Sequence, residues 1–273
     1  MWTASSGCVP LPGALTLLEI AGGLAAVGGT GTGHTIPGWT QEVNRGCTLR
    51  HDAIYPSWAD LAMLRDRFGW SFVSAGQDHL NISKLTVAQQ WQESCGSLSA
   101  LAQHGHNRAW GLFAPRDNAT TRQIQTEVVA TCFAYGRKYR TTSNLQGEMA
   151  VPWFQGTLSV NGGACRDPAL PCYSIPTRHR YLGRADLARA MRPAAGQWSA
   201  VQVYHLVRDS LLTGDPRSHW DCTSPNPDAH WTGRTELYCW NDYLAALQQI
   251  PTGTVITDPA TVATAWGRTP PFS

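Results

Sequence analysis

Polar residues that can transfer protons or bind metals follow five short apolar runs in this 273-residue chain. Apolar runs of this kind are typical of buried strands in parallel sheets. Barrels of alternating strands and helices carry their active sites at the carboxyl ends of such strands. The polar groups are Arg50-His51-Asp52, Gln77-Asp78-His79, Arg116-Asp117, Arg137-Lys138 and His205. The pattern predicts a site for acid–base or metal-assisted chemistry at one edge of a sheet.

Helix-like segments separate these runs. Ser57 with Asp60 forms a capping box before a helix that should end at Gly69, and Thr86 with Gln89 starts a second helix. The alternation of strands and helices predicts an α/β fold with a parallel sheet. Strands are expected at 47–49, 70–73, 110–114, 131–134, 201–204 and 254–256, and further helices at 123–129, 240–249 and 259–266.

A single domain is expected to hold most of the chain. Residues 1–46 are rich in Gly, Thr and Pro, which predicts an extended N-terminal arm packed on a domain of residues 47–273. Residues 28–33 lack the Gly-Lys-Ser/Thr ending of a phosphate-binding loop and predict a flexible loop instead. The apolar stretch 14–27 contains Glu19 and follows no basic segment, so it does not predict a signal peptide.

Eight cysteines without any Cys-x-x-Cys spacing favour disulfides over a metal cluster. We therefore expect a secreted protein. Cys165 with Cys172 and Cys222 with Cys239 would be local staples in loop-rich regions. The remaining four could pair as Cys8–Cys47 and Cys95–Cys132, although sequence alone leaves the connectivity open.

The charge balance argues against a polyanionic partner. The formal net charge is +2 and the basic residues are scattered, so we expect no nucleic-acid binding. The stretch 14–27 is too short to span a bilayer. We expect a monomer without a membrane span.

The segment 69–89 resembles the second motif of the polysaccharide deacetylase family, the NodB-like carbohydrate esterases. The positions in step with that motif are Ser74, His79, Asn81, Ile82, Leu85 and Thr86. Residues 49–53 resemble the family's first motif, 113–115 its third, and 203–205 its late His motif, with Trp198 just ahead. The resemblance spans about residues 47–266 and implies a distorted (β/α)7 barrel, here with a loop-rich periphery stapled by disulfides.

That family removes N-acetyl groups from amino sugars with a divalent metal held by one Asp and two His. Carried over by position, the resemblance implies that Asp52 and His79 are metal ligands and that His205 is the general acid. The metal, zinc for instance, would polarise the amide carbonyl and activate a water molecule. The substrate would be a polysaccharide or cell-wall glycan.

Two positions depart from the family pattern. The second metal-binding His falls on Ala75, and the usual catalytic-base Asp falls on His51. Catalytic zinc normally takes three protein ligands, so His51 would have to join Asp52 and His79. Adjacent residues of a strand point to opposite faces, so this requires the chain to have left the strand at that point. The family's fourth motif is not recognisable, and Arg137 or Trp153 could occupy its region.

Two other functions stay open because of the alanine at position 75. A metal-free glycoside hydrolase on the same barrel could use strand-end carboxylates, Asp52, Asp78 and Asp117. A non-catalytic glycan-binding protein is the third possibility. Twelve tryptophans suit either, because aromatic rings can stack on sugar faces. Residues expected to contact substrate are Arg50, Gln77, Arg116, Arg137, Trp153 and Trp198.

Overall fold

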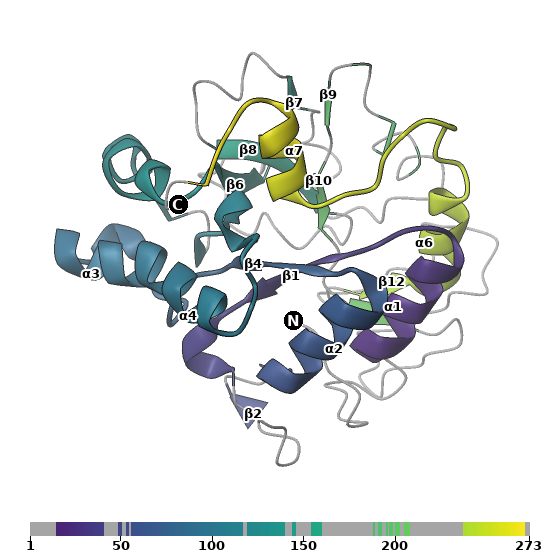
Figure 1. Ribbon diagram of the computed structural model, residues 1–273, viewed down its shortest axis with the longest axis horizontal. Coiled ribbons are helices and arrows are strands. Elements are labelled where there is room, and N and C mark those ends of the chain that lie inside the picture. Colours follow the sequence, from purple (N-terminus) through teal and green to yellow (C-terminus); the bar gives the residue numbers. More distant parts are fainter. Residues whose placement is uncertain are drawn as a thin grey trace, which may run out of the picture.

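The structure is a computed structural model of the chain (Figure 1). It describes residues 15–40, 49–50, 53–54, 56–116, 119–139, 144–145, 154–159, 188, 191–192, 195, 197–198, 200–202, 205–207 and 237–270.

Six parallel strands form the main sheet, in the order β1-β4-β5-β6-β8-β10. Each strand therefore pairs with the strand of this sheet that comes next in the chain, so the chain crosses the sheet in one direction. Parallel pairing requires a crossover between each pair of strands. The predicted α/β character with a parallel sheet is confirmed. The strands are β1 (Thr32–Thr35), β4 (Ser71–Ser74), β5 (Leu112–Phe113), β6 (Tyr135–Tyr139), β8 (Phe154–Ser159) and β10 (Ala200–Gln202).

The first strand of the sheet comes from the segment that we expected to be an extended arm. Helix α1 (Leu17–Ala26) precedes β1, and β1 pairs along its whole length with β4. The expected arm is therefore wrong over the described residues 15–40. The expected strand at 47–49 is also wrong as a member of the main sheet. Its described residue Leu49 lies in β2 (Leu49–Arg50), which pairs antiparallel with β3 (Ala53–Ile54).

Of the strands in the middle of the sheet, two lie close to their expected positions and one does not. The expected strands at 70–73 and 110–114 correspond to β4 and β5. The strand expected at 131–134 is wrong, because Val129–Thr131 is a 3-10 turn (η7) and β6 begins at Tyr135. Cys132 and Phe133 precede the strand but pack in the hydrophobic core, which explains why this stretch has the apolar character of a strand. Residues 254–256, expected as a strand, are in no strand.

Short strands outside the main sheet form two more pairs. β11 (His205–Val207) pairs parallel with β12 (Leu237–Cys239), and β7 (Asn144–Leu145) pairs antiparallel with β9 (Gln197–Trp198). His205 therefore begins a separate strand, β11, whereas we expected it at the carboxyl end of the strand that starts near Val201.

Both predicted capping boxes are present. Ser57 and Asp60 cap α2 (Trp58–Phe68), which ends at the left-handed Gly69, and Thr86 and Gln89 cap α3 (Val87–Trp91). From α3 the chain continues through a π-helical turn, η3 (Gln92–Gly96), into α4 (Ser97–Gln103). The other helical elements are η1 (Pro37–Trp39), η2 (Ile82–Lys84), η4 (Ala109–Gly111), η6 (Ile124–Val128), α6 (Trp240–Leu247) and α7 (Pro259–Ala265).

Helices pack in two groups beside the sheet (Figure 1). Helix α1 contacts α2, and Gly23 of α1 lies so close to the Trp240 ring of α6 that a β-carbon would overlap it. The α3–η3–α4 segment crosses from β4 to β5. None of the helices in the described ranges is long and apolar enough to cross a membrane.

Side chains of the sheet alternate between two faces, and the register shows which residues share a face. Phe72, Ser74 and Phe113 lie on the face that α4 covers. On this face the Ser74 Oγ lies 2.5 Å from the Ser97 Oγ of α4. The other face carries His34, Val73, Ala75, Leu112, Ala114, Tyr135 and Arg137. The face that carries Arg137 is therefore opposite the α4 layer.

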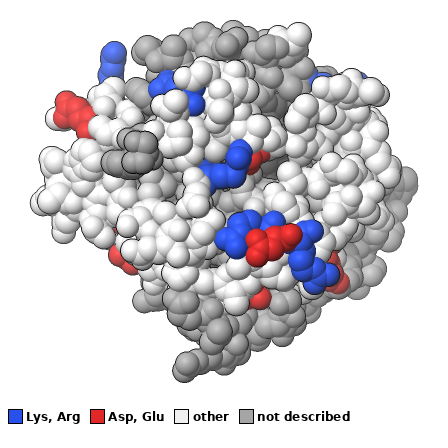
Figure 2. Space-filling view, in the orientation of Figure 1, with Lys and Arg blue, Asp and Glu red and all other residues white. Residues whose placement is uncertain are grey.

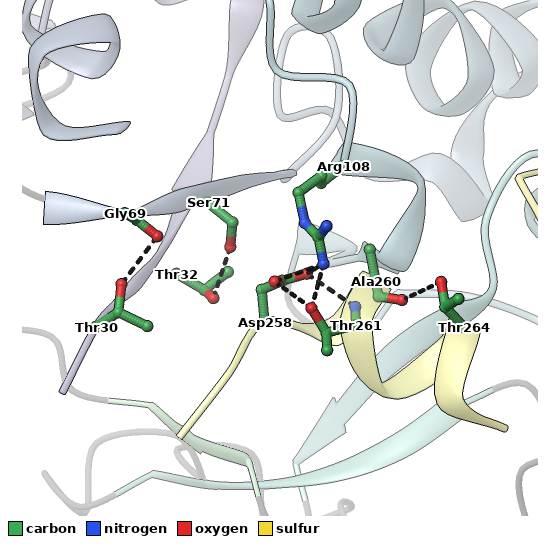
Figure 3. A network of polar contacts seen from close by, with 9 residues as sticks. All are labelled: Thr30, Thr32, Gly69, Ser71, Arg108, Asp258, Ala260, Thr261 and Thr264. Carbon is green, nitrogen blue, oxygen red and sulfur yellow. Dashed lines mark hydrogen bonds and ion pairs between the residues drawn. The ribbon is translucent and has the colours of Figure 1, made fainter. Parts of the chain in front are cut away.

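Polar contacts tie the sheet to its surroundings (Figure 3). The hydroxyl of Thr32 on β1 lies 2.9 Å from that of Ser71 on β4. Arg108, just before η4, contacts Asp258 at 2.8 Å and also the Thr261 hydroxyl. Asp258 in turn caps α7 by accepting from the Thr261 N–H. These contacts fix α7 against the amino end of β5.

A disulfide joins Cys95 and Cys132, as expected. It links η3 to the segment that leads into β6. Cys239 is also disulfide-bonded. The expected pairing Cys8–Cys47 and the pair Cys165–Cys172 lie outside the described residues, as does Cys222.

His106 makes the stability of this fold depend on pH. Its ring is buried against Phe72, and its Nε2 has no hydrogen-bond partner among the described residues. Burial lowers its pKa from 6.5 to about 4. Between these values the unfolded chain binds a proton that the folded chain does not, so stability falls as the pH falls through this window.

We expect this residue to cost up to about 3 kcal/mol of unfolding free energy between pH 7 and pH 4. Urea unfolding at both pH values, for the wild type and for His106→Gln, measures it. The variant should lose clearly less stability on acidification. Equal losses in the two proteins would show that His106 is not the group responsible.

Candidate functional site

The loop after β4, residues 74–80, forms the best-defined part of the carboxyl edge of the sheet. Its first turn is closed by the Gly76 N–H, which donates to the Ser74 hydroxyl at 3.0 Å. On either side, the Ala75 N–H donates to Thr35 of β1 and the Ala114 N–H donates to Ser74, both at 2.8 Å. The loop is therefore held between β1 and β5.

His79 is fixed in this loop by its ring and by its backbone. The Nδ1 atom lies 2.9 Å from the carbonyl oxygen of Ala75. A carbonyl oxygen only accepts, so Nδ1 carries the proton and Nε2 carries the lone pair of the neutral ring. The residue has φ 56°, and it is the only non-glycine residue with positive φ in the described part of the chain. Such backbone strain is concentrated at functional sites.

Trp39 and Arg116 flank His79 from neighbouring strand ends. The Trp39 ring, on η1 after β1, meets the imidazole edge to face with 5.7 Å between centroids. Arg116, which follows β5, donates from Nη1 to the His79 carbonyl oxygen at 3.4 Å. Three successive strand ends therefore converge at His79.

Arg137 lies within β6 on the same face of the sheet as Ala75 and Ala114. It is only 5% exposed, and its Nη2 donates to the Pro115 carbonyl oxygen at 3.2 Å. Sequence analysis placed this arginine after a strand. The structure places it inside one, so its guanidinium rises from the sheet itself.

The residues beside Arg137 at this edge of the sheet are apolar, and two of the three are alanines. Ile36, Ala75 and Ala114 form a separate buried cluster, with Trp39 packed against it. The alanine side chains are short, so the carboxyl edge between Trp39 and Arg137 is lined by methyl groups. This lining lowers the local dielectric constant and strengthens charge interactions nearby.

His34 of β1 is the third charged or titratable group of this face. Burial lowers its pKa well below 6.5, and the positive charge of Arg137 lowers it further. His34 is therefore neutral at physiological pH. The register puts His34 and Arg137 on one face of the sheet, and we call these two residues together with His79 the edge cluster.

Of the residues predicted from sequence, Gln77, Asp78, His79, Arg116 and Arg137 come together at or beside the carboxyl edge. Trp198 packs instead against the Tyr135 ring, with 5.9 Å between centroids. His51, Asp52, Asp117 and Trp153 lie outside the described residues, and Arg50 and His205 are described in their backbone only. Their predicted roles stay predictions.

Three further residues of this region, His34, Trp39 and Glu93, do not stand out in the sequence pattern. His34 and Trp39 fell in the segment taken for an arm, although β-branched Thr32 and Thr35 around His34 are typical of a strand. Glu93 lies in the middle of a helical segment, and the residues three and four positions away from it are Gln89, Gln90, Gly96 and Ser97. These neighbours are not apolar, so no signal in the sequence marked Glu93 as buried.

The described residues contain no group of three side chains suited to a metal ion. His79 offers one ligating nitrogen there, and its Nδ1 contact with a carbonyl is a common feature of metal-binding histidines. Catalytic zinc takes three protein ligands, and the other two predicted ones, His51 and Asp52, lie outside the described residues. We therefore derive no catalytic step through a metal.

Chemically, the edge cluster offers a neutral imidazole with a defined lone pair and a buried guanidinium. Such a pair can take a proton from water and stabilise a developing oxyanion. No family model matches the sequence, and neither the curated proteins nor the solved structures include a significant match.

Proposed function

We propose that this protein is a hydrolase that removes acyl groups, acetyl above all, from a glycan. The observation that carries the proposal is His79: its Nδ1 is bound to the Ala75 carbonyl, which leaves Nε2 as the basic atom at the carboxyl edge. The resemblance of residues 69–89 to the second motif of polysaccharide deacetylases, which implies a metal-ligand role for His79, also supports a role for this residue at the reacting centre.

In the proposed reaction Nε2 of His79 takes a proton from water as the water oxygen bonds to the acyl carbon. Arg137 stabilises the negative charge that develops on the carbonyl oxygen. The bond from the acyl carbon to the sugar nitrogen or oxygen then breaks, and the imidazolium returns its proton to that leaving atom. Acetate and the free sugar amine or hydroxyl are the products.

The fold supports a NodB-like barrel as the scaffold. The six parallel strands succeed one another in chain order, which is how the sheet of a (β/α) barrel is wound. We propose that the sheet closes into a distorted (β/α)7 barrel, with His34 and Arg137 on its inner face. Active sites of such barrels lie at the carboxyl ends of the strands, where the edge cluster is.

A neutral, carbohydrate substrate fits the surroundings of the cluster. Trp39 provides an aromatic ring beside His79 on which a sugar ring can stack. Figure 2 shows one face of the molecule, on which charged side chains of the described residues stand singly or in small groups between large uncharged areas. The Cys95–Cys132 disulfide supports secretion, where such substrates occur.

The test is an assay of purified protein on three glycans: N-acetylated chitin oligosaccharides, O-acetylated xylan and deacetylated xylan. We expect acetate to be released from an acetylated glycan without new reducing ends, and to be released equally after dialysis against a chelator. Reducing ends without acetate would indicate a glycoside hydrolase. Calorimetric binding without any product would indicate a glycan-binding protein, and either result would refute the proposal.

A further inference from the structure

We propose that Glu93 is a positioning residue, whose carboxylate holds the loop 76–80 so that His79 keeps its Nδ1-protonated tautomer. Glu93 is the second residue of η3, in the helical segment behind the loop, and is only 3% exposed. It has no place in the chemistry proposed above. The catalytic consequence of this inference rests on the proposed function, but the structural consequence does not.

The carboxylate accepts hydrogen bonds from two backbone N–H groups of the loop. Oε2 accepts from Asp78 at 3.0 Å and Oε1 from Leu80 at 2.8 Å. The His79 N–H between them also favours the charged carboxylate and so acts to lower its pKa. In addition, the Glu93 backbone carbonyl accepts from the Gln77 N–H at 2.8 Å. Three backbone N–H groups of the loop, those of Gln77, Asp78 and Leu80, are thus bound by one residue.

A buried carboxylate is costly unless its hydrogen bonds are satisfied. Burial raises the pKa of Glu93, and the N–H groups of Asp78, Leu80 and His79 act in the opposite direction. Charge-assisted bonds of this type are about twice as strong as neutral ones. The loop and the carboxylate therefore stabilise each other.

The backbone shape of the loop depends on this contact. His79 has φ 56°, a conformation that a non-glycine residue adopts only when its surroundings enforce it. Gly76 has φ 96°, and a β-carbon there would overlap Oε1 of Glu93. The loop thus closes directly over the carboxylate, and this closure brings the His79 ring to the carbonyl of Ala75.

The isosteric change Glu93→Gln tests this inference without altering volume. A glutamine offers one oxygen acceptor, and its NH₂ group would face a backbone N–H of the loop, so at least one donor loses its acceptor. An unsatisfied buried donor destabilises the arrangement, and the loop should open. The matched control is Glu127→Gln on η6, where the exposed side chain accepts from Gln123 within its own helical segment.

The primary measurement is NMR, which needs no activity. In the wild type, ring ¹⁵N shifts of His79 should show the Nδ1-protonated tautomer, and the amides of Asp78, His79 and Leu80 should be protected from exchange. In Glu93→Gln we expect mixed tautomers and a loss of protection of at least about 10-fold. If Glu93→Gln keeps both signatures, Glu93 does not position His79.

Activity gives the second measurement. Because a small displacement of a reacting group is costly, kcat should fall about 10- to 100-fold with KM nearly unchanged, while Glu127→Gln stays at the wild-type value. An inactive wild type would refute the proposed function and leave the NMR result to decide this inference.

A second variant covers the case in which Glu93→Gln does not fold. Gly76→Ala places a methyl group where Oε1 lies and also strains the backbone at φ 96°, so it disturbs the contact with the carboxylate from the side of the loop. The same mixed tautomer of His79 is expected. An unchanged tautomer in this variant would overturn the inference.

Discussion

Replacing His79 with alanine should lower kcat/KM on an acetylated glycan by about 10²- to 10⁴-fold, the usual contribution of a general base. The physical reason is the loss of the Nε2 lone pair. In the wild type the contact of Nδ1 with the Ala75 carbonyl keeps the proton on Nδ1 and the lone pair on Nε2. Steady-state acetate release measures the effect. His104→Ala is the matched control, because His104 stacks on Trp58 in the turn after α4, ahead of β5.

Chemical rescue distinguishes a base from a residue that only shapes the loop. Added imidazole should restore part of the activity of His79→Ala, because a free imidazole can take the proton in place of the missing ring. The pH at which half the rescue is reached should follow the pKa of the added base. Activity above about a tenth of wild type in His79→Ala, without imidazole, would exclude His79 as the base.

Removing the Cys95–Cys132 disulfide should lower the free energy of unfolding by about 3–4 kcal/mol. The two cysteines are 37 residues apart in sequence, so the bond restricts a long loop of the unfolded chain. Urea unfolding of Cys95→Ser/Cys132→Ser measures the loss. The double variant is preferred because a single change leaves a reactive thiol next to the helical segment.

The same variant also tests whether the disulfide positions Glu93 in the folded protein. Cys95 lies two residues after Glu93, so the bond anchors the turn that carries the carboxylate to the segment before β6. If only the unfolded state is affected, kcat at 20 °C stays at the wild-type value while stability falls. A stability loss below about 1 kcal/mol would contradict the loop-closure account.

Local sequence signals predicted local structure well. Ser57 with Asp60 and Thr86 with Gln89 cap their helices as expected, because a capping box involves residues only three positions apart. The expected strand at 70–73 lies within one residue of β4, since Trp70, Phe72 and Val73 give this short stretch an apolar character.

Two strands were predicted wrongly because contacts with residues distant in sequence determine the residue types there. β1 was missed because its Gly33 reads as a loop residue, whereas in the fold a β-carbon there would overlap the ring of Phe72. β6 was placed four residues early because Cys132 and Phe133 are buried outside any strand. In both cases the residue type is set by a neighbour that is distant in sequence, which a pattern of local hydrophobicity does not contain.

The sequence by itself determined the chain's alternation of strands and helices and the histidine-bearing loop after β4, and it offered Cys95–Cys132 as one of several possible disulfide pairings. These depend on spacing and on residue type. Only the tertiary structure decided which groups meet at that loop. The register of four parallel strands places His34 and Arg137 on one face, and the helical crossover brings Glu93 beneath residues 76–80. Register and crossover packing arise from contacts between distant segments, so they determine the site although no single motif encodes them.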